Sequence, residues 1–382
     1  MIPAEFDDIR PFTPEEMPAA IDCLLSDPQF TAIVSSFYKD VPLEMLRRQA
    51  HACKDNLEFQ KTFFYPLVGA ILARHSDGCT IDTSALPDKT QSYTFVSNHR
   101  DIVLDAALLS AKLVDEGFPD TPEIALGDNL LVYPWIRTLV RLNKSFIVKR
   151  SVGMREMLRS SQVMSSYMHY VVSQKHSCIW IAQREGRAKD SDDRTQESLL
   201  KMMAMGGEGT PLERLDALNI VPLTISYEYD PCDFLKAKEF QQKRDDPHFK
   251  KSPEDDLRNM QTGIFGYKGR IHYQMAAPVN DWLEELRDEP KGKIFVALAA
   301  RMDRAIHRGY RIYPNNYVAL DLLEGGTRFA DRYTPEQKAR FEQYLRERID
   351  LVDLPDKDEA FLRERLLTMY ANPLRNHLAA QA

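Results

Sequence analysis

Short apolar segments alternate with longer amphipathic segments between residue 93 and about residue 280. Several short segments are apolar on both faces, which is typical of strands that helices cover on each side of a mostly parallel sheet. The predicted strands span residues 93–97, 123–126, 145–148, 178–182, 220–226 and 270–275. This alternation predicts an α/β fold with a mostly parallel central sheet flanked by helices.

Helical patterns precede and follow the alternating region. Residues 13–16 (TPEE) and 334–337 (TPEQ) both have the form of a capping box with proline at the first helical position, and Asp27-Pro28 and Val41-Pro42 are further helix starts. The predicted organisation comprises an N-terminal helical region (1–75), a polar linker (76–92), an α/β domain (93–310) and a C-terminal helical region (311–382). Within the α/β domain, the highly charged stretch 231–268 is predicted to be an irregular, solvated insertion.

Composition narrows the class of protein. The chain of 382 residues is 43% hydrophobic and 28% charged, which is typical of a globular protein. Its net charge of −7 argues against a general nucleic-acid binder, which usually carries a basic excess. The five cysteines lie far apart without a CxxC pair, which indicates a reducing compartment and gives no zinc-site spacing.

Membrane spans and a secretion signal are not predicted. The first residues are acidic, and no apolar run reaches the roughly 18 residues of a spanning helix. The longest candidate, residues 63–73, is interrupted by Pro66. It is either a core helix or, with Phe63, Phe64 and Leu67, a face that dips into the headgroup region of a bilayer. We expect a cytoplasmic protein, peripheral at the inner face of the cell membrane.

The first candidate for chemistry is His99. An apolar strand ends just before Asn98-His99, and a helix-like run carrying Asp105 follows. Ligands bind at the carboxyl edge of open α/β sheets, and a helix start there suits an anion. A carboxylate, either Asp105 or Asp101, could hold the imidazole in one tautomer and leave its other nitrogen as a general base. The alternative is a structural histidine beside a helix start.

Three further candidate segments lie within or directly after predicted strands of the same pattern. Lys149 and Arg150 end a strand inside the basic stretch 137–159, which suits a phosphate-bearing substrate, although a solvated helix face would look similar. In the segment 184–187 (REGR), glycine permits close backbone approach, glutamate could orient a hydroxyl acceptor, and arginine could bind phosphate; the alternative is a plain turn. Pro222 inside an apolar strand could shape the wall of an apolar pocket.

In this order, the four segments resemble the sequence blocks of the glycerophospholipid acyltransferases, the lysophosphatidate and glycerol-3-phosphate acyltransferases. That family has Asn-His-x4-Asp, Phe-x-x-Arg, Glu-Gly-(Thr/Gly)-Arg and Val-Pro blocks. The corresponding residues here are Asn98-His99 with Asp105, Phe146 with Lys149-Arg150, Glu185-Gly186-Arg187, and Val221-Pro222. The resemblance covers about residues 93–226.

Three departures from the family pattern indicate a divergent branch. Five residues, not four, separate His99 from Asp105, which rotates the acid by ~100° if the segment is helical and makes Asp101 a rival partner. Arginine follows Phe146 one place later than in the family, and Glu185-Gly186-Arg187 lacks the intervening residue.

The resemblance implies that His99 takes a proton from an acceptor hydroxyl, whose oxygen attacks an acyl thioester, while Asp105 or Asp101 orients the imidazole. The implied substrate-binding residues are Arg100, Phe146, Lys149, Arg150, Glu185, Gly186, Arg187 and Pro222. Acyl-CoA or acyl carrier protein would be the co-substrate, with no other cofactor and no metal. The favoured acceptor is 1-acylglycerol-3-phosphate, with glycerol-3-phosphate and a lyso-aminolipid as alternatives.

Other functions remain open or are excluded. A non-catalytic, peripheral lipid-binding protein on the same fold would account for the altered block spacings, and a transacylase or lipid hydrolase could use the same histidine. The segment 99–101 (HRD) imitates the catalytic loop of a protein kinase, but Ala106 stands where that loop requires asparagine, and no Asp-Phe-Gly follows. A kinase is therefore excluded.

Overall fold

The computed structural model describes residues 2–38, 41–86, 88–150, 153–290 and 292–382. Within these ranges one seven-stranded sheet has the order β1-β7-β6-β2-β5-β3-β4. The strands are β1 (Cys79–Asp82), β2 (Thr94–Ser97), β3 (Glu123–Gly127), β4 (Ser145–Val148), β5 (Ile179–Ala182), β6 (Ile220–Tyr227) and β7 (Ile271–Met275). All neighbours are parallel except β6 and β7, which are antiparallel. The predicted α/β fold with a mostly parallel sheet is confirmed.

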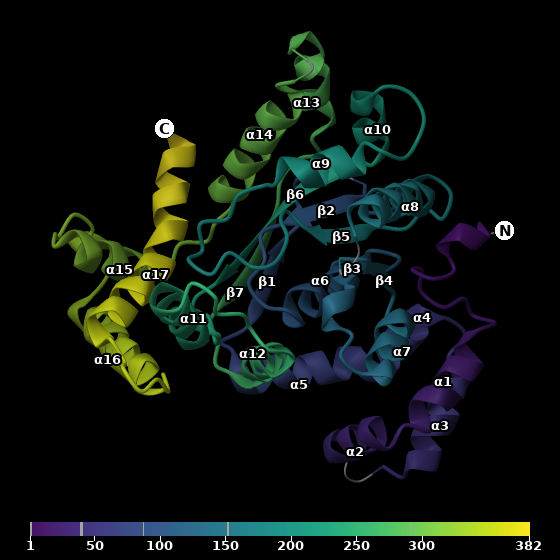
Figure 1. The fold of residues 1–382 in the computed structure, drawn as a ribbon, viewed down its shortest axis with the longest axis horizontal. Helices are drawn as coiled ribbons and strands as arrows, with labels where there is room; N and C mark the ends of the chain where they lie inside the picture. The colour runs from purple at the N-terminus through teal and green to yellow at the C-terminus, as the bar shows by residue number, and fades with distance from the viewer. Residues whose placement is uncertain (1, 39–40, 87, 151–152, 291) are drawn as a thin grey trace.

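Helices cover both faces of this sheet (Figure 1). One face carries α5 (Tyr65–His75) and α6 (Leu104–Asp115), with α12 (Pro253–Phe265) beside α5. The other face carries α8 (Met154–Ser173), α9 (Glu197–Met203), α10 (Pro211–Ala217), α13 (Asn280–Glu285) and α14 (Ile294–Arg308). Phe95 and Trp180 pack toward the first face, whereas Val96 and Ile181 pack toward the second. Because side chains alternate along a strand, strands covered on both faces must be apolar throughout.

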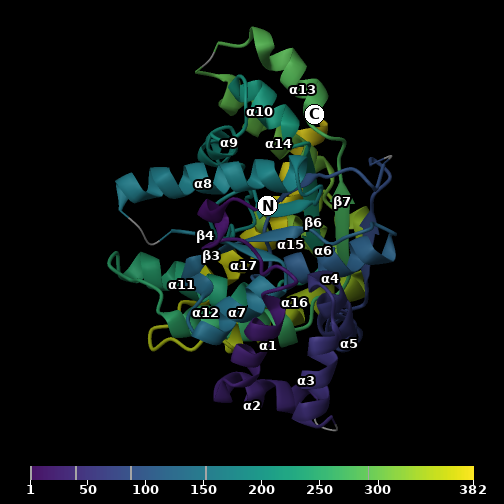
Figure 2. The same cartoon turned by 90° about the vertical axis from the view of Figure 1, so that its right-hand side faces the viewer.

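The N-terminal helices form a separate apolar cluster at the end of the sheet (Figure 2). They are α1 (Met17–Leu25), α2 (Pro28–Phe37), α3 (Leu43–Ala52), α4 (Asn56–Phe59) and η2 (Gln60–Phe64), and α7 (Pro134–Leu142) packs on α1. The short η1 (Ala4–Phe6) instead packs through Phe6 on Tyr167 of α8. Asp27 caps α2 as predicted, accepting from the backbone of Gln29 and Phe30. Residues 14–16 form a turn, and α1 begins at Met17, three residues after Pro14, where a helix capped by Thr13 would have begun.

The apolar run near residues 63–73 packs on the core with one side, through Val68 and Ile71, while Tyr65 is exposed. Phe63 and Phe64 are half-buried and pack against Phe59 with ring centroids 5.1 and 6.1 Å apart, and Leu67 packs on the cluster around α6. The interfacial alternative for these three side chains is therefore not supported. No helix among the described residues is long and apolar enough to span a membrane.

A third helical cluster contains the C-terminal helices α15 (Pro314–Glu324), α16 (Pro335–Asp350) and α17 (Glu359–Gln381). Thr334 and Gln337 form the predicted capping box at the start of α16. The long α17 packs along α14, α15 and α11 (Asp233–Asp245), so this cluster is joined to the sheet domain. Short helical turns complete the chain: η3 (Asp128–Leu130), η4 (Leu286–Asp288) and η5 (Ala330–Arg332).

Two predictions along the chain are wrong. The charged stretch 231–268 is not irregular, because it forms α11 and α12. Lys236 of α11 is only 2% exposed and pairs with the buried Asp230, while Asp233 pairs with Arg348 of α16. Charges paired inside a protein need not face water, so a charged helix can be buried. The linker 76–92 contains the edge strand β1, whose half-exposed pattern lacks the apolar signal of the central strands.

Candidate active site

His99 follows the carboxyl end of the buried strand β2, on backbone that Asn98 fixes in place. The Asn98 side-chain Nδ2 donates to the Ile225 carbonyl at 2.8 Å, and the Ile225 amide donates to Asn98 Oδ1 at 2.7 Å. These reciprocal bonds tie the end of β2 to the neighbouring strand β6. The histidine therefore starts from a rigid platform at the edge of the sheet where ligands bind in open α/β folds.

The imidazole contacts the carboxylate of Asp105 in the first turn of α6. His99 Nδ1 lies 2.8 Å from Asp105 Oδ2, and this oxygen also accepts the backbone amides of Arg100 at 2.6 Å and Asp101 at 3.0 Å. Asp105 is fully buried. A carboxylate accepts and does not donate, so Nδ1 carries the proton and Nε2 is left as the basic nitrogen. Trp180 packs edge-on against the imidazole with centroids 5.6 Å apart.

The rival carboxylate, Asp101, has a different task. Its Oδ1 accepts the backbone amides of Val103 at 2.9 Å and Leu104 at 2.7 Å, so it caps α6. Burial, reinforced by the nearby charge of Asp105, raises the pKa of Asp101. The capping turn accommodates the additional residue between His99 and Asp105 before the helix begins. The unusual spacing thus still brings Asp105 to the imidazole.

Arg100 points away from His99 into the protein interior. Its guanidinium is 6% exposed, pairs with the buried Asp193, and donates to the Tyr310 hydroxyl at 3.1 Å. Tyr310 in turn donates to Asp193 Oδ2 at 2.9 Å. The substrate-binding role predicted for Arg100 does not fit this position, because no face of the guanidinium meets the cavity described below.

Phe146 and Pro222 also lie outside that cavity. Phe146 is fully buried in β4 and packs against Tyr167 with centroids 5.3 Å apart. Pro222 is buried in β6 beside Val96 of β2. Neither side chain lines the cavity, so the substrate-binding role predicted for each is not supported.

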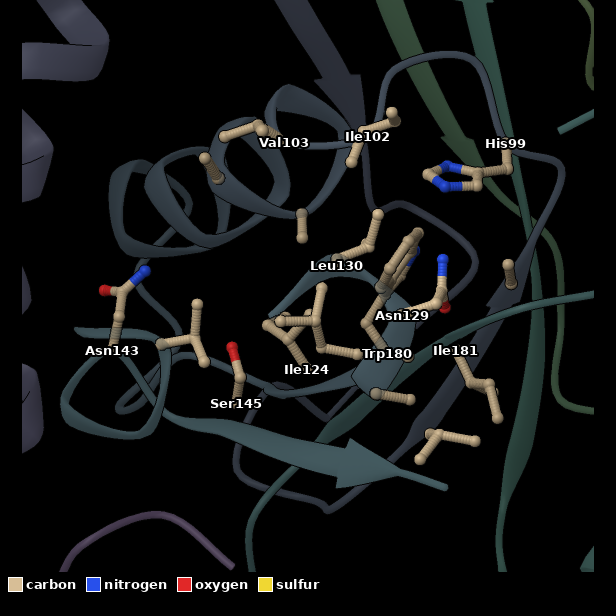
Figure 3. A pocket seen from close by; sticks show the side chains of 18 of the residues that line it. His99, Ile102, Val103, Ile124, Asn129, Leu130, Asn143, Ser145, Trp180 and Ile181 are labelled. Atoms are coloured by element: carbon tan, nitrogen blue, oxygen red, sulfur yellow. The ribbon is translucent and has the colours of Figure 1, made fainter. Parts of the chain in front are cut away.

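A cavity of about 860 Å³ opens beside His99 and extends across the sheet end (Figure 3). Its wall is mostly apolar and includes side chains from both main clusters: Ile124 and Trp180 from the α6 face, Ile181 and Met164 from the α8 face. Elements α5, α6, α7, α8, β3 and β5 all contribute. The volume lies within the usual range for small-molecule sites, ~300–1,000 Å³.

Positive side chains line one part of this cavity. The basic residues are Lys149, Arg150, Arg184, Arg187, Lys189 and Lys251. Glu185, Gly186 and Asp256 also line the cavity. Arg187 Nη2 donates to Asn259 Oδ1 at 3.2 Å, whereas its Nη1 is buried and has no partner among the described residues. Gly186 has a φ of 67°, which favours glycine in this turn. Burial lowers the pKa of Lys189 to about 8, although Glu239 pairs with it.

Five predicted substrate-binding residues therefore meet in the cavity: Lys149, Arg150, Glu185, Gly186 and Arg187. The sequence prediction omitted Trp180, Asn143 and Ser145, which line the same cavity. Ser145 had a detectable signal, as a polar first residue in an otherwise apolar strand. Trp180 had none, because an aromatic residue in a buried strand is ordinary core.

Comparison with known proteins identifies this part of the chain. Residues 81–226 match the Acyltransferase family model. This segment is similar to the domain that the family model describes. It includes His99, Asp105 and the 184–187 turn, and it confirms the family resemblance of the four sequence blocks. No curated protein matches the chain.

Among solved structures, the chain is similar to the 1-acyl-sn-glycerophosphate (LPA) acyltransferase PlsC from Thermotoga maritima. The TM-score is 0.37 and the sequence identity is 12%, with 75% of this chain and 92% of that chain covered. Both values are low, so this likeness carries no argument about the chain.

Proposed function

We propose that the protein is an O-acyltransferase that moves a fatty acyl group from a thioester, acyl-CoA or acyl carrier protein, to the hydroxyl of a lysophospholipid-type acceptor. The observation that carries this proposal is the 2.8 Å contact between His99 Nδ1 and Asp105 Oδ2, beside an apolar cavity and within an acyltransferase-family segment. The proposed acceptor is 1-acylglycerol-3-phosphate.

In the proposed reaction, His99 Nε2 takes the proton of the acceptor hydroxyl while the hydroxyl oxygen attacks the thioester carbonyl carbon. The new C–O bond forms, the C–S bond breaks, and the thiolate leaves as a thiol after taking the proton from the imidazolium. Asp105 keeps the imidazole in the required tautomer and stabilises its charged form. A general base placed in this way contributes ~10²–10⁴-fold to the rate.

Two features favour an acceptor that has both a phosphate and a chain of its own. The unpartnered Arg187 Nη1 and the neighbouring basic side chains suit a phosphate, which guanidinium groups bind in two-pronged fashion. The cavity borders apolar side chains on both faces of the sheet, so it offers separate apolar walls for two chains. Glycerol-3-phosphate would leave one wall without a ligand, and a phosphate-free lyso-aminolipid would leave the basic groups without one.

We further propose that the enzyme works at the inner surface of the cell membrane. Phe37 of α2 and Phe265 of α12 are 45% and 47% exposed, and their rings stack with centroids 6.3 Å apart. Exposed aromatic side chains of this kind suit the boundary between headgroups and acyl chains.

The test measures free thiol released from a long-chain acyl-CoA and from acyl carrier protein thioester, each with and without lysophosphatidate. Wild type is compared with His99→Ala, Asp105→Asn and the matched carboxylate variant Asp101→Asn. Release that depends on the acceptor, and that is lost in His99→Ala and Asp105→Asn but kept in Asp101→Asn, is the expected result. Release without an acceptor would indicate a hydrolase. Lysolipid binding without release from either donor would favour a non-catalytic lipid-binding protein.

A further inference from the structure

The end of the cavity opposite His99 is polar. Asn143 and Ser145 line it, as Figure 3 shows, on either side of the start of β4. Ser145 is in register with Ile124, which is in register with Trp180, and Trp180 with Phe95 of β2. Ser145 therefore lies about four residues back along the strand direction from His99, roughly 13 Å, and three strands across, roughly 14 Å.

The polar groups at this end lack partners. Asn143 Oδ1 is buried and has no hydrogen bond within the part of the chain that the structure describes. Ser145 is only 5% exposed, and its hydroxyl bonds to no other described residue. A buried polar group without a partner costs about 1–3 kcal/mol, so such groups in a cavity wall indicate a ligand or water that satisfies them.

The surrounding contacts hold these groups in place. Thr121 Oγ1 donates to Gln60 Oε1 at 2.5 Å, and Gln60 Nε2 donates to the Asn143 carbonyl at 3.2 Å. Between Asn143 and Ser145, Lys144 has a φ of 59°, a conformation that is uncommon outside glycine. The polar end is thus a fixed feature of the wall.

The polar end is also uncharged. The Lys144 ammonium points away from the cavity, where it contacts Asp120 Oδ2 at 2.5 Å and the Thr121 carbonyl at 2.7 Å. A charged ligand group here would be buried without a counter-charge, which is strongly unfavourable. An asparagine amide and a serine hydroxyl can both donate and accept, which matches a hydroxyl or a keto oxygen.

We propose that this polar end, Asn143 with Ser145, recognises an uncharged oxygen function, a hydroxyl or keto group, on the distal half of an acyl chain that extends from His99. This inference names the substrate class of the proposed acyltransferase site and rests on that proposed function for the direction of the chain. An unsubstituted chain would leave the Asn143 side-chain amide and the Ser145 hydroxyl beside hydrocarbon. A suitably placed oxygen would satisfy both.

The turnover test compares a palmitoyl thioester with derivatives that carry one hydroxyl group at successive positions along the distal half of the chain. Wild type should prefer the best-placed hydroxyl derivative by about tenfold in kcat/KM, the value of one net hydrogen bond. Ser145→Ala and Asn143→Leu should remove the preference, so that each variant uses the best-placed hydroxyl derivative and the unsubstituted chain with similar kcat/KM. Ser161→Ala, which changes a cavity-lining serine on α8, is the matched control and should keep the preference.

A binding test separates this inference from the proposed reaction. Equilibrium dialysis of palmitic acid and of the same hydroxyl derivatives requires no turnover. Tighter binding of one derivative to wild type, lost in Ser145→Ala, would support the polar end even if no thioester reacted, in which case only the acyltransferase proposal would fail. Equal binding of the plain acid and every derivative to folded wild type would overturn the inference, whatever the turnover result.

Discussion

His99 and Arg100 are sequence neighbours on one turn, yet their side chains meet opposite environments. His99 faces the cavity and bonds through one nitrogen only, to Asp105. Arg100 faces the interior and is held by Asp193 and Tyr310. The turn is therefore fixed from its buried side, which leaves its cavity side available for chemistry. Precise placement of a general base depends on such support behind it.

The segment that holds Arg100 on the buried side of the turn also contacts α14. His307 Nε2 of α14 lies 2.8 Å from the Asp193 carbonyl, and Asp303 Oδ1 accepts the Thr195 amide at 2.7 Å. Tyr310, which contacts Arg100, follows the same helix. Elements outside residues 81–226 thus contribute to holding the segment that carries His99, and the family match alone would not have indicated this.

The largest expected effect is on the cavity side. His99→Ala should lower kcat by ~10²–10⁴-fold because the general base is removed. The midpoint of thermal unfolding should stay near the wild-type value, since the imidazole makes only one hydrogen bond and is not part of the buried network. Thiol release and a thermal melt measure the two quantities. Retained turnover in a folded His99→Ala protein would contradict the proposed role.

A substitution on the buried side of the turn should instead lower the stability of the fold. Arg100→Leu should lower the free energy of unfolding by about 3–5 kcal/mol, because it leaves the buried Asp193 charge unpaired. The double variant Arg100→Leu/Asp193→Leu is the control, and it should recover most of this loss because neither charge remains. Chemical denaturation gives the values. If Arg100→Leu were as stable as wild type but had a raised KM for the acceptor, this would support the substrate-binding role predicted for Arg100.

Sequence patterns predicted the fold better than the orientation of individual side chains. Six of the seven strands in the described sheet were found because strands buried on both faces are continuously apolar, whereas the half-exposed edge strand β1 has no such signal. The burial of α11 depends on Arg348, more than a hundred residues away, so local charge could not predict it.

The same limit applies within the site. His99 and Asp105 could be predicted because a helix start follows a strand there. Phe146 and Ser145 are adjacent in β4, yet Ser145 lines the cavity and Phe146 does not, although Val148, which has the parity of Phe146, also lines it. Sequence alternation therefore does not show which side chains of a strand border a cavity, and here the family block led to a core residue.

Arg187 extends the comparison, because it is the same residue type as Arg100 but lines the cavity. Its Nη2 donates to the neutral Asn259, and its Nη1 has no hydrogen-bond partner among the described residues. Arg187→Leu should raise the KM for lysophosphatidate by about 10–100-fold, the value of one charge-assisted hydrogen bond of ~1.5–3 kcal/mol, with little change in the KM for the thioester. An equal rise for a phosphate-free acceptor would contradict phosphate binding.

The smallest expected effect separates the two carboxylates near His99. Asp101→Ala should lower the free energy of unfolding by about 1 kcal/mol because α6 loses its cap.

Asp101→Asn keeps an oxygen for the cap but removes the titrating group. Burial raises the pKa of Asp101, so the folded wild type keeps this proton to a higher pH than the unfolded chain does. The stability of the wild type therefore falls as the pH rises above about 4, the ordinary pKa of an aspartate. The stability of Asp101→Asn relative to wild type should therefore increase between about pH 4 and neutrality, as urea denaturation at several pH values would measure. A constant difference across that range would show that Asp101 does not titrate as its buried position requires, and a large loss of kcat in Asp101→Asn would reassign it as a partner of the imidazole.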